Sequence, residues 1–350
     1  MPQTAYFRFF LKLLKAKLLN KDIPLIVILC VTNRCNLRCW YCYGEHPFRS
    51  DWRDFSTDEL INIVDELGKM GTQILQFQGG EPLLREDLDI IIKRAKSYGM
   101  VCDMVTNATL VKKRLDFVRL LDKVCISLDG PAELNDYNRG EGVYDRVIEG
   151  IELIRKSGIP IRISSVLTSR TKKEHIDWLL DFAESKNILV NFSPSFEFLP
   201  QTESDEFSPH EIPDEYLREL FRYILLKKKE RAAVQFSCRS FDVAIKWPFS
   251  YGKRQLVKED ENVDFSYPRC YHGKYVIFID SDGSVYPCCN FWGRQKLNIF
   301  KQGLKESVSE VDRNNCECCY IPAYVDRNLF FDFNLRVWWN YIVQAIKGGV

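Results

Sequence analysis

The chain has 350 residues, of which 46% are hydrophobic and 28% are charged, a composition typical of soluble globular proteins of about two domains. Its 49 lysines and arginines are balanced by 48 acidic residues, so we expect no strong overall field and no nucleic-acid partner. No run of about 20 uninterrupted apolar residues is present, so we expect no transmembrane helix.

Thirteen cysteines are the most unusual part of this composition. Their number is odd and they are clustered, and we expect no cleavable signal peptide before them. Disulfide scaffolds of secreted proteins are usually much smaller. We therefore expect these thiols to be metal ligands in a protein of the reducing cytoplasm.

Residues 1–23 are predicted to form an amphipathic helix. Apolar side chains recur at helical spacing and basic side chains occupy the other faces, namely Phe7, Phe10, Leu11, Leu14 and Leu18 against Arg8, Lys12, Lys15 and Lys17. Such a helix could cap the domain that follows or make a peripheral membrane contact. The sequence leaves both roles open.

Residues 24–210 alternate between short β-branched runs and longer helical patterns. We predict strands at 25–31, 73–78, 101–106, 123–128, 160–167 and 188–193, and helices at 57–70, 86–98, 111–121, 144–156 and 172–186. Ser56 and Glu59 form a capping box before the first of these helices. Six consecutive strand–helix steps predict an α/β fold with a parallel sheet, a partial (β/α)6 TIM-like barrel. Ligands of such folds bind at the carboxyl ends of the strands.

The pattern loosens after this barrel. Residues 211–265 are predicted to be a linker region with a charged helix at 214–231. Residues 266–350 are predicted to form a small cysteine-rich module of a β-hairpin, at 275–279 and 284–288, and helices. Trp338, Trp339 and Tyr341 indicate a C-terminal helix that packs back onto the body of the protein.

Cys35, Cys39 and Cys42 form a C-x3-C-x2-C triplet directly after the first predicted strand. Three thiolates can hold three corners of a four-iron cluster and leave the fourth iron open for a ligand. A closed zinc site is the alternative, because His46 follows at a spacing that would complete a Cys3His set.

The second predicted strand is followed by Gly79-Gly80-Glu81-Pro82, at the same edge of the sheet as the triplet. Paired glycines let the backbone approach a ligand closely, and their carbonyls can accept hydrogen bonds from an ammonium group. A plain strand-to-helix turn is the alternative for this motif taken by itself.

With both motifs in place, residues 25–193 resemble the radical S-adenosylmethionine (SAM) superfamily. The resemblance implies a [4Fe-4S] cluster on the three cysteines, with SAM chelating the open iron through its amino and carboxylate groups. It also implies SAM contacts at Tyr41, near the adenine, and at strand ends, namely Gly79, Gly80, Glu81, Pro82, Thr106, Asn107, Ser127, Asp129 and Arg139. Ala108 departs from the Thr-Asn-Gly run that relatives often carry after the third strand.

Cys270, Gly283 and Cys288 have a C-x12-G-x4-C spacing that resembles the start of SPASM and twitch domains. Together with Cys316 and Cys319, the two cysteines could hold one auxiliary [4Fe-4S] cluster. No cysteine follows Cys319, which favours the shorter twitch arrangement. Zinc suits the same four thiols, and the neighbouring Cys289 and Cys318 leave the assignment of individual ligands open.

The remaining cysteines and histidines are assigned no chemistry. The isolated cysteines are expected to be small buried core residues, namely Cys30, Cys102, Cys125 and Cys238. The isolated histidines stand in polar surroundings, namely His175, His210 and His272.

The resemblance implies reductive cleavage of SAM to a 5'-deoxyadenosyl radical that abstracts hydrogen from a substrate carbon. A flavodoxin or ferredoxin-type protein would donate the electron. The N-terminal extension is too short for a separate peptide-recognition domain, so we expect net oxidation or modification of a small metabolite, sugar or lipid-linked substrate. A peptide- or protein-modifying maturase and a non-enzymatic iron-sulfur or zinc regulatory protein are the alternatives.

Overall fold

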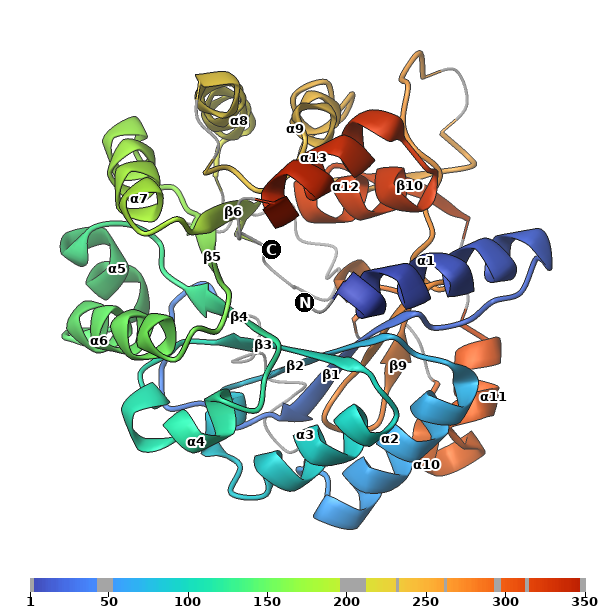
Figure 1. Ribbon diagram of the computed structural model, residues 1–350. Helices are drawn as coiled ribbons and strands as arrows, with labels where there is room; N and C mark the ends of the chain where they lie inside the picture. The colour runs from blue at the N-terminus through green and yellow to red at the C-terminus, as the bar shows by residue number, and fades with distance from the viewer. Residues whose placement is uncertain are drawn as a thin grey trace.

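The computed structural model describes residues 3–42, 53–195, 212–230, 233–260, 263–292, 297–311 and 315–346. Within these ranges one eight-stranded sheet has the order β6-β5-β4-β3-β2-β1-β8-β9. Its first six strands are parallel neighbours in chain order and curve around a central space (Figure 1), namely β1 (Ile26–Thr32), β2 (Ile74–Gly79), β3 (Val101–Thr106), β4 (Lys123–Ser127), β5 (Ile161–Leu167) and β6 (Leu189–Pro194). The expected partial barrel is confirmed.

Helices connect these strands across the outer face of the sheet (Figure 1), namely α2 (Thr57–Met70), α3 (Leu88–Ser97), α4 (Leu115–Val118), α5 (Ala132–Arg139), α6 (Val143–Lys156) and α7 (Lys173–Ser185). The capping box of Ser56 and Glu59 starts α2 as predicted. The helix predicted at 111–121 is instead a 3-10 turn followed by the short α4, because Arg114 between them has a φ of −128° and interrupts the helix.

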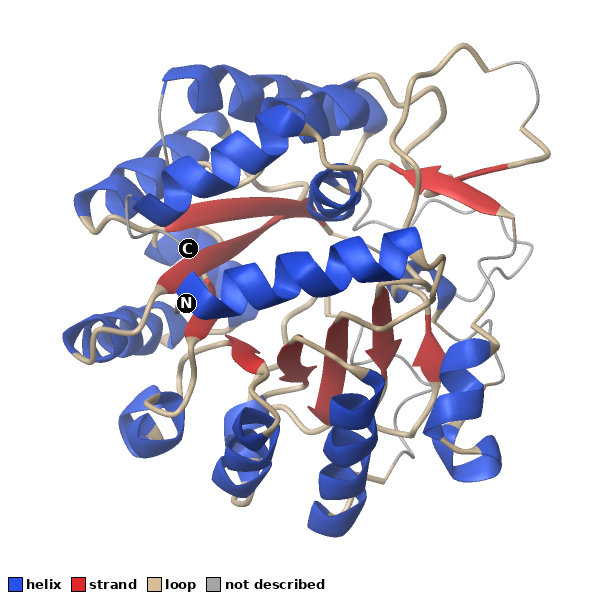
Figure 2. Ribbon diagram, turned by 45° about the vertical axis from the view of Figure 1, so that its right-hand side comes forward, coloured by secondary structure: helices blue, strands red, loops and turns tan. Residues whose placement is uncertain are grey.

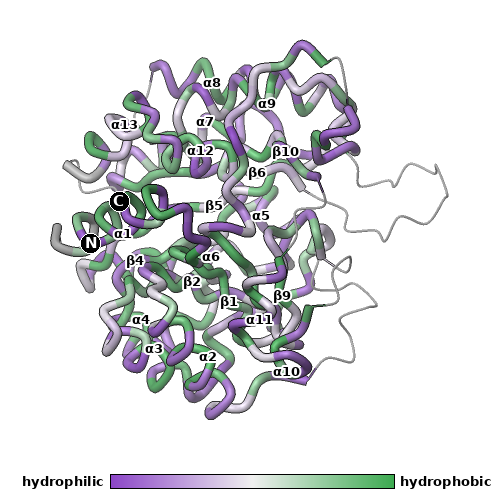
Figure 3. The backbone as a smooth tube through the Cα atoms, turned by 90° about the vertical axis from the view of Figure 1, so that its right-hand side faces the viewer, coloured by the Kyte–Doolittle hydropathy of each residue, from purple (hydrophilic) through white to green (hydrophobic). Residues whose placement is uncertain are grey.

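The two faces of the sheet differ in polarity. Side chains that point outward pack against the helices and are fully buried, for example Phe77, Met104 and Phe192. In Figure 3 the barrel strand β1 is mostly hydrophobic, and the outer helices alternate in character, as expected for helices with one buried face. The inward face of β2 to β5 carries many polar side chains, and this face surrounds a cavity.

The C-terminal region extends the same sheet. The hairpin predicted there is confirmed as β8 (Val276–Ile279) and β9 (Val285–Tyr286), but β8 also pairs in parallel with β1. A second, two-stranded sheet joins β7 (Gln255–Val257) to β10 (Cys316–Cys319). The division of the chain after residues 23, 210 and 265 stays a prediction.

The described residues form seven further helices. They are α1 (Gln3–Leu18), α8 (Asp214–Glu230), α9 (Cys238–Ile245), α10 (Ile299–Gln302), α11 (Leu304–Ser309), α12 (Pro322–Phe331) and α13 (Leu335–Ile346). Figure 2 shows α1 crossing in front of the strands. As predicted, α13 packs back onto the body: the ring of Trp338 stacks on Phe330, and its Nε1 donates to the Phe330 carbonyl oxygen at 2.9 Å.

The N-terminal helix packs one of its faces into the core. Phe9 and Leu13 are buried in a cluster with Tyr275 and Phe331, whereas Phe7 and Leu18 are exposed. None of the described helices is both long and apolar enough to cross a bilayer. The capping role of α1 is therefore visible in the structure.

Candidate functional site

One cavity of about 1070 Å³ occupies the inside of the curved sheet. One end lies at the carboxyl ends of the strands, where the cysteine triplet follows β1, and the other end lies against α12 and α13. Most of the side chains predicted to bind the cluster and SAM line it, namely Cys35, Cys39, Tyr41, Cys42, Gly79, Gly80, Thr106, Asn107, Ser127 and Arg139. Glu81, Pro82 and Asp129 are not part of this lining.

The cysteine loop presents three partly buried thiols to the cavity. Its turn is closed by a backbone hydrogen bond from Cys42 N to Cys39 O at 2.9 Å, and Leu37 N donates to Cys35 Sγ at 3.4 Å. Burial raises the pKa of Cys35, and it raises the pKa of Cys39 to about 12. A metal would have to displace both protons, as iron does when thiolates bind it. His46, the alternative ligand, lies outside the described residues.

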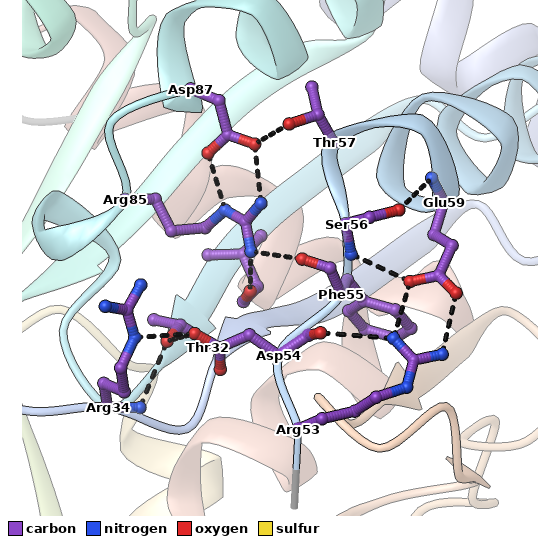
Figure 4. Close-up of polar contacts among 11 residues, drawn as sticks. Thr32, Arg34, Arg53, Asp54, Phe55, Ser56, Thr57, Glu59, Arg85 and Asp87 are labelled. Atoms are coloured by element: carbon purple, nitrogen blue, oxygen red, sulfur yellow. Dashed lines mark hydrogen bonds and ion pairs between the residues drawn. The ribbon is translucent and has the colours of Figure 1, made fainter.

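A carboxylate fixes the start of this loop (Figure 4). Asp54 accepts hydrogen bonds from Thr32 Oγ1 at 2.7 Å, from Asn33 N at 2.9 Å and from Arg34 Nε at 2.7 Å. These donors are the residues directly before the first cysteine. The hydrogen bonds to Asn33, Thr32 and Arg34 keep the pKa of the Asp54 carboxyl low although burial opposes them. Asp54 is therefore ionised at neutral pH and orients the loop.

A buried arginine continues the same support (Figure 4). Arg85 Nη1 donates to the carbonyl oxygens of Val31 at 3.0 Å and Phe55 at 2.9 Å, and its other nitrogens form a two-pronged ion pair with Asp87. Asp87 also accepts from Thr57 Oγ1 at 2.6 Å. The end of β1, the start of α2 and the turn after β2 are thereby tied together behind the cysteine loop.

The two glycines after β2 are required by the close approach of two backbone segments. A Cβ atom on Gly79 would lie 2.1 Å from Thr32 O, and one on Gly80 would lie 2.1 Å from Arg34 O. Gly79 also has a φ of 140°, which other residues rarely adopt. Gly80 N donates to Thr32 O and Glu81 N to Arg34 O, both at 2.8 Å. The glycine motif is thus fastened to the backbone that leads into the cysteine loop.

Glu81, the third residue of this motif, is completely buried. Its carboxylate accepts hydrogen bonds from Thr106 Oγ1 at 2.7 Å, from Asn107 N at 2.8 Å and from Leu83 N at 3.1 Å. Burial raises the pKa of Glu81 to about 7, and the three hydrogen bonds only partly oppose this shift. Pro82 begins the short 3-10 turn that Leu83 belongs to. Glu81 thus links the ends of β2 and β3 from behind the cavity wall.

Asp129 and Arg139 form a buried ion pair after β4. Arg139 donates to both Asp129 oxygens, at 3.0 and 2.8 Å, and Asp129 also accepts from Tyr41 Oη at 2.7 Å and from Val166 N at 3.0 Å. The Asp129 oxygens are used by these protein donors, so its carboxylate positions Tyr41 and Arg139 at the cavity wall. Ser127 lines the cavity.

The four C-terminal cysteines predicted to share one site come from three segments, since Cys316 and Cys319 both lie on β10, and they gather together. Burial raises the pKa of Cys319, and the thiols of Cys270, Cys288 and Cys316 raise it further. Burial also raises the pKa of Cys288, with contributions from Cys270 and Cys316. Such mutual effects require proximity. Thiols are the ligand type that both an iron-sulfur cluster and zinc take, so the chemistry of the donors suits either group.

The two extra cysteines have different surroundings. Cys289 faces the cavity and accepts a hydrogen bond from Tyr324 Oη at 2.9 Å. Cys318 is fully buried, and Cys270 and Cys316 contribute to its raised pKa after the larger effect of burial. Among the described residues no three His, Cys, Asp or Glu side chains stand close enough together to hold a single metal ion.

The outcome for the isolated residues is mixed. Cys30, Cys102 and Cys125 are buried as expected, but Cys125 also lines the cavity, and Cys238 is only half-buried on α9. His210 lies outside the described residues. Sequence reasoning missed the supporting Asp54 and Arg85, which have no motif of their own, and it missed the charged side chains inside the sheet. The polar residues at every second position of these strands could have indicated the charged side chains inside the sheet.

Comparison with known proteins identifies the class to which this site belongs. Residues 29–183 match the family model described as "Radical SAM superfamily", and this part of the chain is a radical SAM domain. The family binds a [4Fe-4S] cluster and SAM, and its SPASM-type members carry auxiliary clusters. The resemblance inferred from the cysteine triplet and the glycine motif is confirmed at the level of the family, whose characterised members are enzymes.

Two curated relatives come from Methanosarcina barkeri (strain Fusaro). The chain is 27% identical over 281 residues to its AdoMet-dependent heme synthase, a match that covers 76% of this chain and 77% of the relative. It is 32% identical over 174 residues to the Fe-coproporphyrin III synthase, where the match covers 48% of this chain and 43% of the relative. The chain thus spans less than half the length of the second relative.

The fold has close counterparts among solved structures. Native anSMEcpe with bound AdoMet superimposes with a TM-score of 0.62 at 18% identity, covering 91% of this chain and 100% of that chain. At this identity the likeness supports the fold. It includes the C-terminal region and is not restricted to the barrel.

Proposed function

We propose that the protein is a radical SAM enzyme that reductively cleaves SAM and abstracts hydrogen from a carbon atom of its substrate. Cys35, Cys39 and Cys42 would hold the [4Fe-4S] cluster. Gly79, Gly80 and the strand-end polar residues would hold SAM. When bound, these two cofactors supply a 5'-deoxyadenosyl radical. The residues of the chain would bind and orient the cofactors and the substrate. They would also exclude water from the cavity.

The observation that carries this proposal is the fastening of the glycine motif to the cysteine loop. Backbone hydrogen bonds from Gly80 and Glu81 to Thr32 and Arg34 place both motifs at one end of one cavity. A structural zinc site on the triplet has no need of a glycine pair that leaves room for only a hydrogen atom.

The auxiliary site supports a net oxidation. Cys270, Cys288, Cys316 and Cys319 supply four thiols, so the site would be closed and would not bind SAM. Cys289, the residue after one of these ligands, lines the cavity. If these four thiols hold a cluster, it would lie beside the substrate cavity and would supply an electron acceptor there.

A small metabolite is favoured as substrate because the cavity lies inside the barrel and two curated relatives are named as tetrapyrrole-forming synthases. A peptide or protein substrate is the second candidate, since solved structures with the same fold include SuiB bound to its precursor peptide SuiA. A sugar and a lipid-linked molecule remain within the proposed substrate range. A non-enzymatic iron-sulfur or zinc regulator is the alternative that makes no use of the cavity.

Two partners belong to this proposal. An electron donor of the flavodoxin or ferredoxin type would reduce the cluster. The exposed face of α1, which carries Phe7 and Leu18 together with Lys15, would make a peripheral membrane contact. The Phe7→Asp/Leu18→Asp variant should then lose binding to anionic vesicles, and unchanged binding contradicts the contact.

Electron paramagnetic resonance of the anaerobically reconstituted and reduced protein tests the proposed cofactor site. The account predicts a [4Fe-4S]⁺ signal that changes when SAM is added, and that is lost in Cys35→Ala, Cys39→Ala and Cys42→Ala. Cys102→Ala, at a buried thiol outside the site, is the matched control and should keep the signal. A signal from the triplet that is indifferent to SAM would contradict the proposal.

A further inference from the structure

A group of charged side chains lines the end of the cavity that lies away from the cysteine loop. Asp103, Lys123 and Arg162 point inward from the first halves of β3, β4 and β5, and Arg327 reaches in from α12. Asp103 stands directly opposite both Gln76 and Lys123 in the strand register. The strands therefore place these groups side by side.

Only one of these cations has a carboxylate partner. Arg162 Nη2 donates to Asp103 Oδ2 at 2.6 Å, and Gln76 Nε2 donates to the same oxygen at 2.7 Å. Among the described residues no ion pair joins Lys123 or Arg327 to a carboxylate, and Nη1 of Arg327 is buried with no hydrogen-bond partner. Two basic side chains thus face the cavity without an ion-pair partner of their own, and share only the more distant charge of Asp103.

The resulting charge balance is unfavourable for an empty cavity. Lys123, Arg162 and Arg327 supply three positive charges against the one negative charge of Asp103, an excess of two. Burial lowers the pKa of Lys123 and of Arg327, which shows the cost of holding these charges away from water. Asp326, beside Arg327 in sequence, accepts a hydrogen bond from Ser237 N at 2.8 Å and is not part of the lining.

The wall next to these cations is apolar. Ile26, Ile74 and Phe278 contribute it from the sheet, and Phe330 and Trp338 contribute it from the C-terminal helices. A ligand with an acidic end and an apolar body would meet matching chemistry on both sides. An anion at the basic end would also relieve the unpaired charges.

We infer that the inner end of the cavity binds the carboxylate or phosphate group of an amphipathic organic acid, held by Lys123, Arg162 and Arg327. The apolar body extends along Ile74 and Phe278 toward the cysteine loop. The claim that such an acid is the substrate rests on the proposed function. The claim that the cavity binds such an acid is independent of it.

Binding of three ten-carbon probes to the full-length protein tests the inference. Decyl phosphate and decanoate carry the acidic group, and decanol is their neutral counterpart. Calorimetric titration should give at least tenfold tighter binding of one or both acids than of decanol, and the tighter acid identifies the preferred group. Equal affinity for acid and alcohol overturns the inference. Binding of inorganic phosphate without binding of decyl phosphate overturns it as well.

Lys123→Met and Arg327→Met replace each basic side chain with a flexible apolar one and remove one cation each. Both variants should lose the preference for the acids, whereas Lys113→Met and Arg119→Met, on exposed side chains, should keep it. Arg162 is left intact, because its removal would leave Asp103 without its ion-pair partner. Unchanged acid binding in both cavity variants contradicts the inference.

Thermal unfolding gives a second readout. Because each variant removes an unpaired cation, the melting temperatures of Lys123→Met and Arg327→Met should be equal to or higher than that of the wild type. A fall in both variants would mean that the cations have protein partners, and would overturn the inference. Neither measurement requires SAM cleavage. A protein that binds the acids but makes no 5'-deoxyadenosine would contradict the proposed function alone.

Discussion

At the scale of single residues, the cavity wall depends on one buried ion pair. Asp129 and Arg139 are 0% and 6% exposed at their side chains, and together they hold Tyr41 against the wall. Breaking a buried pair leaves a charge without compensation, which is far more costly than losing a surface pair.

Asp129→Asn should therefore lower the free energy of unfolding by roughly 3–5 kcal/mol. Asp89→Asn removes one partner of the exposed ion pair with Lys93 and is the matched control, with an expected cost below about 1 kcal/mol. Urea denaturation of both variants measures the difference. Similar costs in the two variants would show that Arg139 does not depend on Asp129.

The second residue-scale prediction concerns Glu81 and pH. Burial raises its pKa to about 7 in the folded protein, compared with an unperturbed value of 4.5. Between these two values the folded state holds a proton that the unfolded state has released, so stability falls as the pH rises from about 4.5 to 7. The contribution is present below this window and is lost above it.

Glu81→Gln should remove this pH dependence, which amounts to roughly 3 kcal/mol. Urea midpoints at pH 5 and pH 8 give the change of stability with pH for each protein. The difference in this slope between variant and wild type measures the contribution of Glu81. Glu141→Gln, at an exposed side chain, should retain the wild-type slope. An identical slope in Glu81→Gln and the wild type would mean that Glu81 titrates as an ordinary carboxyl.

Motif residues could be predicted from the sequence, whereas the residues that support them could not. Gly79 and Gly80 stand next to each other after a predicted strand, so the local sequence indicates their role. Asp54 and Arg85 act through hydrogen bonds to backbone atoms of distant segments, and no local pattern encodes such partners. Asp129 was expected to contact SAM, and in the structure its oxygens accept hydrogen bonds from Arg139 and Tyr41.

At the scale of elements, the six barrel strands and the hairpin were predicted within one or two residues because β-branched runs mark them clearly, whereas β7 and β10 were missed. The short helix α5 was missed, since its eight polar-rich residues give no apolar periodicity. The pairing of β8 with β1 was also missed, because the register of strands far apart in sequence depends on the assembled sheet.

The N-terminal helix permits an element-scale prediction. Leu13 is fully buried against the core, so Leu13→Ala should cost roughly 2–5 kcal/mol. Leu18 lies on the exposed face, and Leu18→Ala should change stability by less than about 0.5 kcal/mol. Thermal or urea unfolding distinguishes the two variants. Equal effects would show that α1 does not cap the barrel.

At the scale of the whole molecule, the account assigns the cysteines to two sites with different tasks. The triplet leaves an open iron, and the C-terminal set is closed by four thiols. Anaerobically reconstituted protein should contain about eight irons per chain. The Cys270→Ala/Cys316→Ala variant should retain about four, and the Cys39→Ala/Cys42→Ala variant should retain the other four. Four irons plus one zinc in the wild type would assign the C-terminal site to zinc.

The measurement that tests the central claim most directly is the anaerobic formation of 5'-deoxyadenosine from SAM. The account predicts that reduced, reconstituted protein forms 5'-deoxyadenosine and methionine in equal amounts, and that Cys39→Ala forms neither while Cys102→Ala forms both. Failure of wild-type protein with a full iron content to form 5'-deoxyadenosine under these conditions would contradict the assignment of this fold and cavity to radical SAM chemistry.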